Sequence, residues 1–261
     1  EVLTTGEEVA RVAALDALAL SGAEVARGPI VEATLDESGT VRIHAASALG
    51  LVRTADGLSA LCRLIADTDA EVRSAAANSL LVHGRDALTA LIDYYSLRSR
   101  LPEPIVTLTL RAMGDAAVGG LMDLARSQPA HVRAGAINCL VALEHQDLLD
   151  LLPGLMGDLD DEVRGSVRAA VRRFGPEALP YVLRGFLGDS APAEELGRGG
   201  LALLGEVSVQ PLVDLLLDFN SPFRVRAITA LAQVGSATCL EPLVQVMAER
   251  DDSVRVPAQD T

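Results

Sequence analysis

The side chains that could perform chemistry are few in this sequence and lie far apart. They are four histidines and three cysteines, namely His44, His83, His131, His145, Cys62, Cys139 and Cys239. None of them forms a CxxC or HExxH pair, which are the spacings that zinc sites use. The sequence also lacks a P-loop, a dinucleotide-binding glycine fingerprint and a GxSxG turn. We therefore predict no metal, no cofactor and no enzymatic activity.

One group of basic residues could contact a phosphate. Arg164, Arg168 and Arg172 are spaced by four residues, with Arg173 beside them, so a helix would carry them on one face. However, the chain has a net charge of −14, and all its basic residues are arginine. An acidic chain repels nucleic acid and anionic membrane surfaces. We interpret the group as a solvated face that contacts Asp or Glu.

A recurring Val-Arg pair marks the elements that must position these side chains. The pair occurs at Val41, Val72, Val132, Val163 and Val254. Together with Ala10, Pro102, Ala193 and Phe223, these residues form a series whose members lie 30 or 31 residues apart, and we call them the anchors. Small or apolar residues stand four and eight positions after nearly every anchor, so one helical face would bury all three.

Residues typical of helix ends flank this predicted first helix. Three before the anchors stand Ser38, Asp69, Ser99, Asp160, Ser190, Asn220 and Asp251, which can cap a helix N-terminus. Twelve after the anchors stand Gly22, Gly84, Gly114, Gly175, Gly205 and Gly235, which suit a left-handed C-terminal cap. A second apolar segment follows each glycine. Each repeat is therefore predicted to be a helix, a tight turn and a second helix.

Helix pairs of this kind cannot bury their apolar faces alone, but stacking buries them. The blocks from Asp67 to Ala77 and from Asp158 to Arg164 resemble the bacterial short HEAT-repeat family, also described as phycobilisome-lyase HEAT-like repeats. We thus predict an all-α fold, an α/α superhelix (HEAT-like solenoid) of about eight helix-pair repeats. A single solenoid is expected over residues 1–261. Its repeats would start near residues 7, 38, 69, 99, 129, 160, 190 and 220, with a partial ninth from 251.

The resemblance also implies a structural ladder of arginines. In this family such arginines pair with an Asp of a neighbouring repeat, and here they would be Arg42, Arg73, Arg133, Arg164 and Arg224. Asp36, Asp67, Asp158 and Asp218 stand at a matching place, five residues before their anchors.

Two repeats depart from the pattern, because Pro102-Glu103 and Ala193-Glu194 replace the Val-Arg pair. They can be drift, a local change of curvature or a partner site. The glycines at 197, 199 and 200 indicate a weakened first helix in the seventh repeat.

The second helices line the concave side of HEAT arrays of this kind. Residues 21 positions after the anchors would stack into a column of Cys62, Asp93, Asp123, Pro153, Arg184 and Asp214. Tyrosine offers apolar area with a polar tip and is enriched at protein interfaces. We predict that the binding surface consists of Asp93, Tyr94, Asp123, Tyr181, Arg184 and Asp214, with ordinary surface polarity as the alternative.

These observations favour a non-enzymatic protein–protein interaction scaffold or regulatory binding module. Its partner would be a protein or peptide segment with basic residues, without nucleic acid, membrane or metal. A cytoplasmic location is expected, since neither a signal peptide nor a long apolar run is visible. Two other functions stay open: an accessory or lyase-type subunit that assists chromophore or cofactor attachment, and a DNA-acting HEAT-like protein.

Overall fold

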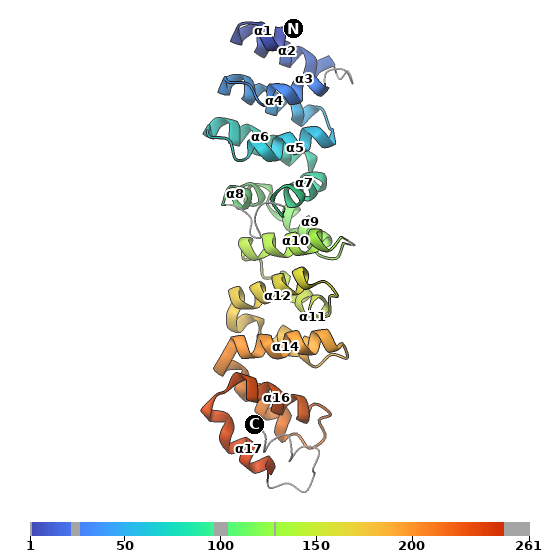
Figure 1. The fold of residues 1–261 in the computed structure, drawn as a ribbon, viewed down its shortest axis with the longest axis vertical. Helices are drawn as coiled ribbons and strands as arrows, with labels where there is room; N and C mark the ends of the chain where they lie inside the picture. The colour runs from blue at the N-terminus through green and yellow to red at the C-terminus, as the bar shows by residue number, and fades with distance from the viewer. Residues whose placement is uncertain (1, 22–26, 97–103, 128, 248–261) are drawn as a thin grey trace. The chain divides into compact units, whose positions relative to one another are not determined.

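The computed structural model describes residues 2–21, 27–96, 104–127 and 129–247. All regular structure in these ranges is helical. The chain divides into two compact units, residues 1–143 and residues 144–261, which we describe separately. Within each unit, successive helix pairs are layered in chain order (Figure 1). The predicted all-α architecture of stacked helix pairs is confirmed.

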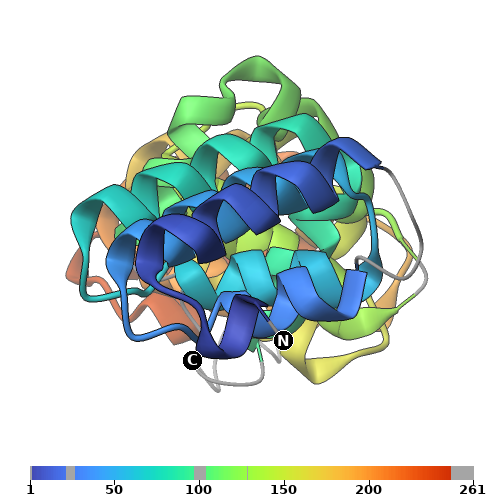
Figure 2. The same ribbon diagram turned by 90° about the horizontal axis from the view of Figure 1, so that it is seen from above.

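Unit 1 contains four helix pairs and the first helix of a fifth. After a short α1 (Val2–Thr5), the pairs are α2 (Glu8–Ser21) with α3 (Arg27–Ala33), α4 (Gly39–Leu51) with α5 (Ala55–Leu64), α6 (Ala70–His83) with α7 (Arg85–Ser96), and α8 (Pro104–Met113) with α9 (Asp115–Leu124); α10 (Ala130–Leu143) follows. The first helices α2, α4 and α6 pack side by side, and the second helices α3, α5, α7 and α9 do the same. Seen from above, α2 and α6 run nearly parallel (Figure 2).

Unit 2 continues the same pattern. It contains α11 (Leu148–Leu155), then α12 (Asp161–Phe174) with α13 (Leu179–Phe186), α14 (Ala191–Leu204) with α15 (Val209–Leu217), and α16 (Arg224–Val234) with α17 (Leu240–Met247). Short 3-10 turns precede the second helices, namely η2 (Gly175–Ala178), η3 (Gly205–Ser208) and η4 (Ala237–Cys239). The first helices α12, α14 and α16 again pack in order. The described residues therefore contain seven helix pairs within the two units, besides the single helices α10 and α11.

The anchor stripe forms the core, as predicted. In the second repeat Val41, Ala45 and Leu49 are fully buried, and the same positions are buried in the third, fifth and sixth repeats. The first repeat differs, because Ala10 is exposed and Leu15 is the buried residue of α2. As the first long helix, α2 packs mainly against α1, α3 and α4 among the described helices, and no first helix of an earlier repeat covers it.

Several predicted helix starts are confirmed in atomic detail. The side chains of Ser38, Asp69 and Asp160 accept hydrogen bonds from amides in the first turns of α4, α6 and α12. Asn220 is a wrong prediction, because α16 begins only at Arg224. The Asp218 side chain instead accepts the Asn220 amide in a turn, and Pro222 follows it. The predicted caps Gly22, Ser99 and Asp251 lie outside the described residues.

The predicted turn glycines do have positive φ, but most are not in the left-handed helical region. Gly84, Gly175 and Gly205 have φ of 55°, 57° and 65° with ψ of −124°, −133° and −132°. Only Gly235, with φ 67° and ψ 27°, is left-handed helical. The former conformation is the mirror of the β region, which glycine alone enters without strain. This glycine conformation lets the next helix or 3-10 turn begin at once, so no loop follows α6, α12 or α14.

The glycines of α14 have a packing role that the sequence analysis missed. A Cβ on Gly197 would lie 2.7 Å from the Phe186 Cβ, and one on Gly200 would lie 3.0 Å from a Val182 methyl group. Gly199 faces open space. Two of the three glycines therefore let α14 approach α13 closely, and the interpretation as a weakened helix fits only Gly199.

One described stretch, residues 191–217, is long and apolar enough to cross a membrane by length and composition. It is not one straight helix, because Gly205 ends α14 and a 3-10 turn precedes α15. Leu201, Leu212 and Leu216 of this stretch are fully buried within the unit. Core packing thus accounts for its apolar composition.

Candidate partner-binding surfaces

Ion pairs join successive repeats at the start of unit 1. Arg42 of α4 binds Asp67 in the loop before α6 through two hydrogen bonds, Nε to Oδ2 at 2.9 Å and Nη2 to Oδ1 at 3.0 Å. Arg11 of α2 forms an ion pair with Asp36 in the loop before α4, with a single hydrogen bond from Nη2 to Oδ1 at 3.1 Å. The Arg42–Asp67 pair has the form that the family resemblance implies, and Arg11–Asp36 repeats this form one repeat earlier. We call each pair a rung.

Asp67 connects three segments of chain. Besides Arg42, it accepts the amide of Asp69, the residue that caps α6, at 2.9 Å. Burial alone would raise the pKa of Asp67, but the hydrogen bonds from Arg42 and from the Asp69 amide together lower it below its ordinary value. The carboxylate is therefore part of the joint between the second and third repeats.

Other arginines of the predicted ladder bind their own loops. Arg73 donates to the carbonyls of Asp67 and Thr68 at 2.8 and 3.0 Å, and Arg133 donates to the Ser127 carbonyl at 3.0 Å. Arg164 donates to the Asp158 carbonyl at 2.6 Å and pairs with Asp161 of its own helix. All three therefore hold the loop that enters their helix.

In unit 2 an ion pair of the opposite polarity joins two repeats, with its second member inside a helix instead of in the loop. The residue five before Ala193 is Gly188, so Arg164 finds no carboxylate there. In the next repeat Glu194 occupies the arginine position, and its Oε2 lies 3.0 Å from Nε of Arg226 in α16. Arg226 also donates to the Gly188 carbonyl at 2.9 Å. The Ala193-Glu194 departure thus coincides with an inverted rung.

The last predicted ladder residue, Arg224, is buried beneath the loop before α16. Its Nε donates to the Leu216 carbonyl at 2.8 Å, and its guanidinium lies 4.8 Å from the centre of the Phe219 ring. A cation above an aromatic face is stabilised by the ring quadrupole. In unit 2 this arginine therefore fixes the end of α15 and an exposed phenylalanine.

Three residues of the predicted binding surface lie on the second helices of unit 1. Asp93 and Asp123 are exposed and Tyr94 is half-buried. Both carboxylates have basic neighbours, since His131 Nε2 lies 3.1 Å from Asp93 and Arg85 Nη1 lies 3.7 Å from Asp123. Their attraction for a cation is therefore weaker than the sequence suggested.

A groove of about 460 Å³ runs between α5 and α7 beside these residues. Helix α7 contributes Asp86, Asp93 and Tyr94 to its lining, and α5 contributes Leu58 and small residues such as Ser59. The small side chains leave the space open, while Tyr94 and the two carboxylates offer apolar area and negative charge. We call it the second-helix groove.

The other three predicted residues lie in unit 2. Arg184 and Asp214 are exposed, on α13 and α15, and Tyr181 is half-buried. Asp214 accepts a hydrogen bond from Gln210 at 2.8 Å. Arg184 and Asp214 are thus exposed, whereas Tyr181 is half-buried like Tyr94 of unit 1.

Cys62 departs from that phasing, because it is fully buried in α5. Burial, with the charge of Asp93 nearby, raises the pKa of its thiol to about 12. Cys139 in α10 is also buried, and burial raises its pKa to about 12. Burial likewise raises the pKa of Cys239 in unit 2. These thiols belong to the core.

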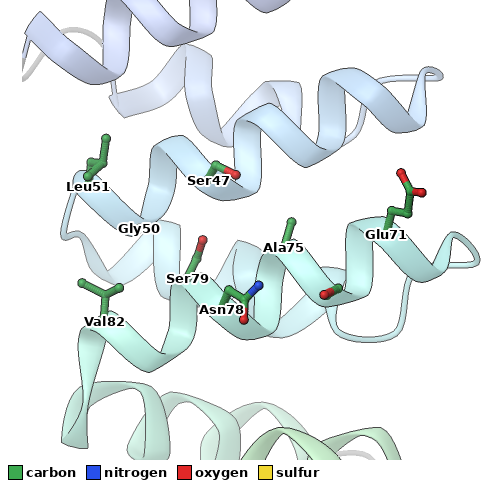
Figure 3. Close-up of a pocket in the computed structure, with 9 residues that line it drawn as sticks. Ser47, Gly50, Leu51, Glu71, Ala75, Asn78, Ser79 and Val82 are labelled. Atoms are coloured by element: carbon green, nitrogen blue, oxygen red, sulfur yellow. The ribbon is translucent and has the colours of Figure 1, made fainter. Parts of the chain in front are cut away.

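A second groove, which the sequence analysis missed, lies between the first helices α4 and α6 and has a volume of about 440 Å³ (Figure 3). Leu51 and Val82 lie at one end of it and Glu71 lies at the other, with Ser47 and Asn78 between them. Gly50 brings the helices together, since a Cβ there would lie 3.1 Å from the Ser79 hydroxyl. The signal was the run of small residues on α4 and α6. We call it the first-helix groove.

The sequence model of HEAT repeats matches residues 1–81 of the chain. This segment is therefore similar to HEAT repeats. This match agrees with the predicted HEAT-like resemblance over the first repeats, and the later helix pairs follow with the same period of 30 or 31 residues. A comparison with curated proteins gives no match.

Several solved structures resemble the chain distantly. An engineered protein is 18% identical, with a TM-score of 0.35, and the alignment covers 99% of this chain and 85% of that one. YibA of Escherichia coli is 18% identical, with a TM-score of 0.35 and coverage of 99% and 89%. The CpcE–CpcF complex of phycocyanin lyase from a Nostoc species is 18% identical, with a TM-score of 0.34 and coverage of 89% and 91%. These similarities are too low to support an argument about function.

Proposed function

We propose that this HEAT-repeat chain is a non-enzymatic scaffold that binds a basic segment of a partner protein on its second helices. The observation that carries the proposal is the second-helix groove, where Tyr94 lies beside Asp86 and Asp93. Tyrosine supplies rigid contact area of the kind found at binding hot spots. The carboxylates would attract lysine or arginine and speed the encounter.

Asp123 on the neighbouring α9 would extend this surface, because α7 and α9 pack side by side. A basic partner would compete with His131 for Asp93 and with Arg85 for Asp123. Both pairs are solvent-exposed, and exposed ion pairs contribute only about 0.2–1 kcal/mol each. The competition is therefore compatible with binding. Tyr181, Arg184 and Asp214 would form a corresponding surface in unit 2.

The test is affinity capture from a lysate of the source organism by the wild-type chain and by an Asp93→Arg, Tyr94→Ala double variant. A Glu37→Arg variant, which reverses a charge in the loop before α4, is the control. We expect the wild type and the control to capture the same partners, and the double variant to lose them. Capture by the wild type should also decrease as the salt concentration is raised. Equal retention by a folded double variant contradicts the proposal.

A further inference from the structure

The first-helix groove has two chemically different ends. At one end Leu51 and Val82 are 67% and 54% exposed, although both are large apolar residues. Leu20 of α2 occupies the same repeat position and is 84% exposed, so three neighbouring first helices present an apolar residue near their C-terminal ends. Stacked repeats align such residues into a continuous ridge.

The opposite end of the groove is acidic. Glu71 is exposed in the first turn of α6, and it forms no ion pair with any residue in the described ranges. Figure 3 shows its carboxylate directed away from α6, at the far end from Leu51 and Val82. Eleven residues of helix separate Glu71 from Val82, which corresponds to about 16 Å at 1.5 Å per residue.

Between the two ends the surface is low and polar. Ser47 and Asn78 offer hydroxyl and amide groups, and Ala75 and Gly50 add almost no height. Small side chains are what allow another helix backbone to approach closely, because they leave a furrow along the helix axes. The groove therefore fits an elongated object that lies along α4 and α6.

We propose that the first-helix groove binds an amphipathic helix of a partner protein. Its apolar residue would cover Leu51 and Val82, and a lysine or arginine about eleven residues away along the same helix would pair with Glu71. Small residues would face Ser47 and Asn78 between them. This surface is separate from the second-helix groove and does not depend on it.

Charge complementarity favours this occupant over a second copy of the chain. Arg53 donates to the Val82 carbonyl at 3.0 Å, so a cation stands beside the apolar end. Two copies laid antiparallel would pair Glu71 with Arg53, but each copy's Leu51 and Val82 would then face a carboxylate. A foreign helix with its basic and apolar residues at opposite ends matches both ends of the groove at once.

The test is selection of a displayed library of helical peptides on the immobilised chain. We expect enriched peptides to carry a basic and an apolar residue about eleven positions apart. The affinity of these peptides should fall about tenfold or more for the Glu71→Arg variant and for the Leu51→Ser, Val82→Ser double variant. Losses of this size are typical when a hot-spot residue is truncated. A repeat of the selection on Glu71→Arg should enrich an acidic residue in place of the basic one.

Matched controls come from unit 2. Glu162 has the same position in α12 as Glu71 has in α6, since both follow an aspartate cap, and Leu159 is an 89% exposed leucine. Glu162→Arg and Leu159→Ser should leave peptide affinity unchanged. Failure to enrich the pattern overturns the proposal. So does peptide binding that Asp93→Arg abolishes and Glu71→Arg preserves, which would support the second-helix groove instead. Concentration-dependent dimers that Leu51→Ser abolishes would make a second copy the occupant and also overturn it.

Discussion

The charge pairs that join successive repeats differ between unit 1 and unit 2. In unit 1, Arg11 and Arg42 reach forward to an aspartate in the next repeat. In unit 2, Arg164 turns to its own helix, Glu194 meets Arg226, and Gly197 brings α14 onto α13. The described joints therefore use charge pairs and close packing, as at Gly50 in unit 1 and Gly197 in unit 2, without one fixed residue at one position.

The largest effect is expected from removing a rung of unit 1. Arg42→Ala takes both hydrogen bonds from the half-buried Asp67 and another from the Asp36 carbonyl, so we expect a loss of about 2–3 kcal/mol in the free energy of unfolding. Arg164→Ala should cost only about 1 kcal/mol, since its partner Asp161 is 92% exposed. Urea unfolding of the two variants checks this. Equal losses would remove the distinction between the units.

Close packing in unit 2 is tested by two neighbouring glycines. Gly197→Ala places a methyl group against Phe186 and should destabilise the protein by about 1–3 kcal/mol. Gly199→Ala meets nothing and should stabilise it by about 0.5–1 kcal/mol, because alanine favours helix. The melting temperature should therefore fall in Gly197→Ala and rise in Gly199→Ala. A shift of the same sign in both variants would contradict the close approach of α13 and α14.

The inverted rung is tested by exchanging its charges. Glu194→Arg and Arg226→Glu should each lower the free energy of unfolding, because each places like charges together. The double exchange should recover about 0.5–1 kcal/mol relative to the sum of the single effects. A double-mutant cycle measures this coupling. A coupling of zero would mean that the pair does not join the repeats.

The smallest effect is expected from acid. The pKa of Asp67 is lower in the folded chain than its ordinary value of about 4, so its stabilising contribution is complete above that pH and is lost as the pH falls through the folded-state value. The stability difference between wild type and Asp67→Asn should therefore shrink as the pH falls from about 5 to 3. We expect a change of about 1 kcal/mol or less, because solvent screens the pair in part. In an Arg42→Ala background the pH dependence should weaken. Urea unfolding at several pH values, with and without Arg42→Ala, measures this. If the prediction is wrong, the stability difference between the wild type and the Asp67→Asn variant will not change with pH.

Most of the fold could be predicted because its signals are local. A cap such as Asp69 and a turn residue such as Gly84 act within a few residues of themselves, and the period of 30 or 31 residues gives the rest. The pairing of Arg42 was implied by the family resemblance, and the Asp that recurs five residues before the anchors indicated its partner. The prediction of Asn220 as a helix cap was wrong because Asp218 and Pro222 determine the turn before α16.

The surfaces were harder to predict, because they depend on pairs of helices. Helix phasing correctly exposes Asp93, but it cannot show that His131 of α10 lies beside it. The pairing of Glu194 with Arg226 has no repeated residue types to indicate it. The first-helix groove arises from small residues on two helices and a close approach at Gly50, which only the packed structure reveals.

The labelling rates of the buried cysteines can measure local opening of the fold without any mutation. A buried thiol with a raised pKa reacts slowly with an alkylating reagent until the surrounding helices separate. The labelling rates of Cys62 and Cys139 would report the opening of unit 1, and the labelling rate of Cys239 would report that of unit 2. Mass spectrometry of the three labelled peptides therefore gives separate lifetimes for the two halves of one unmodified chain.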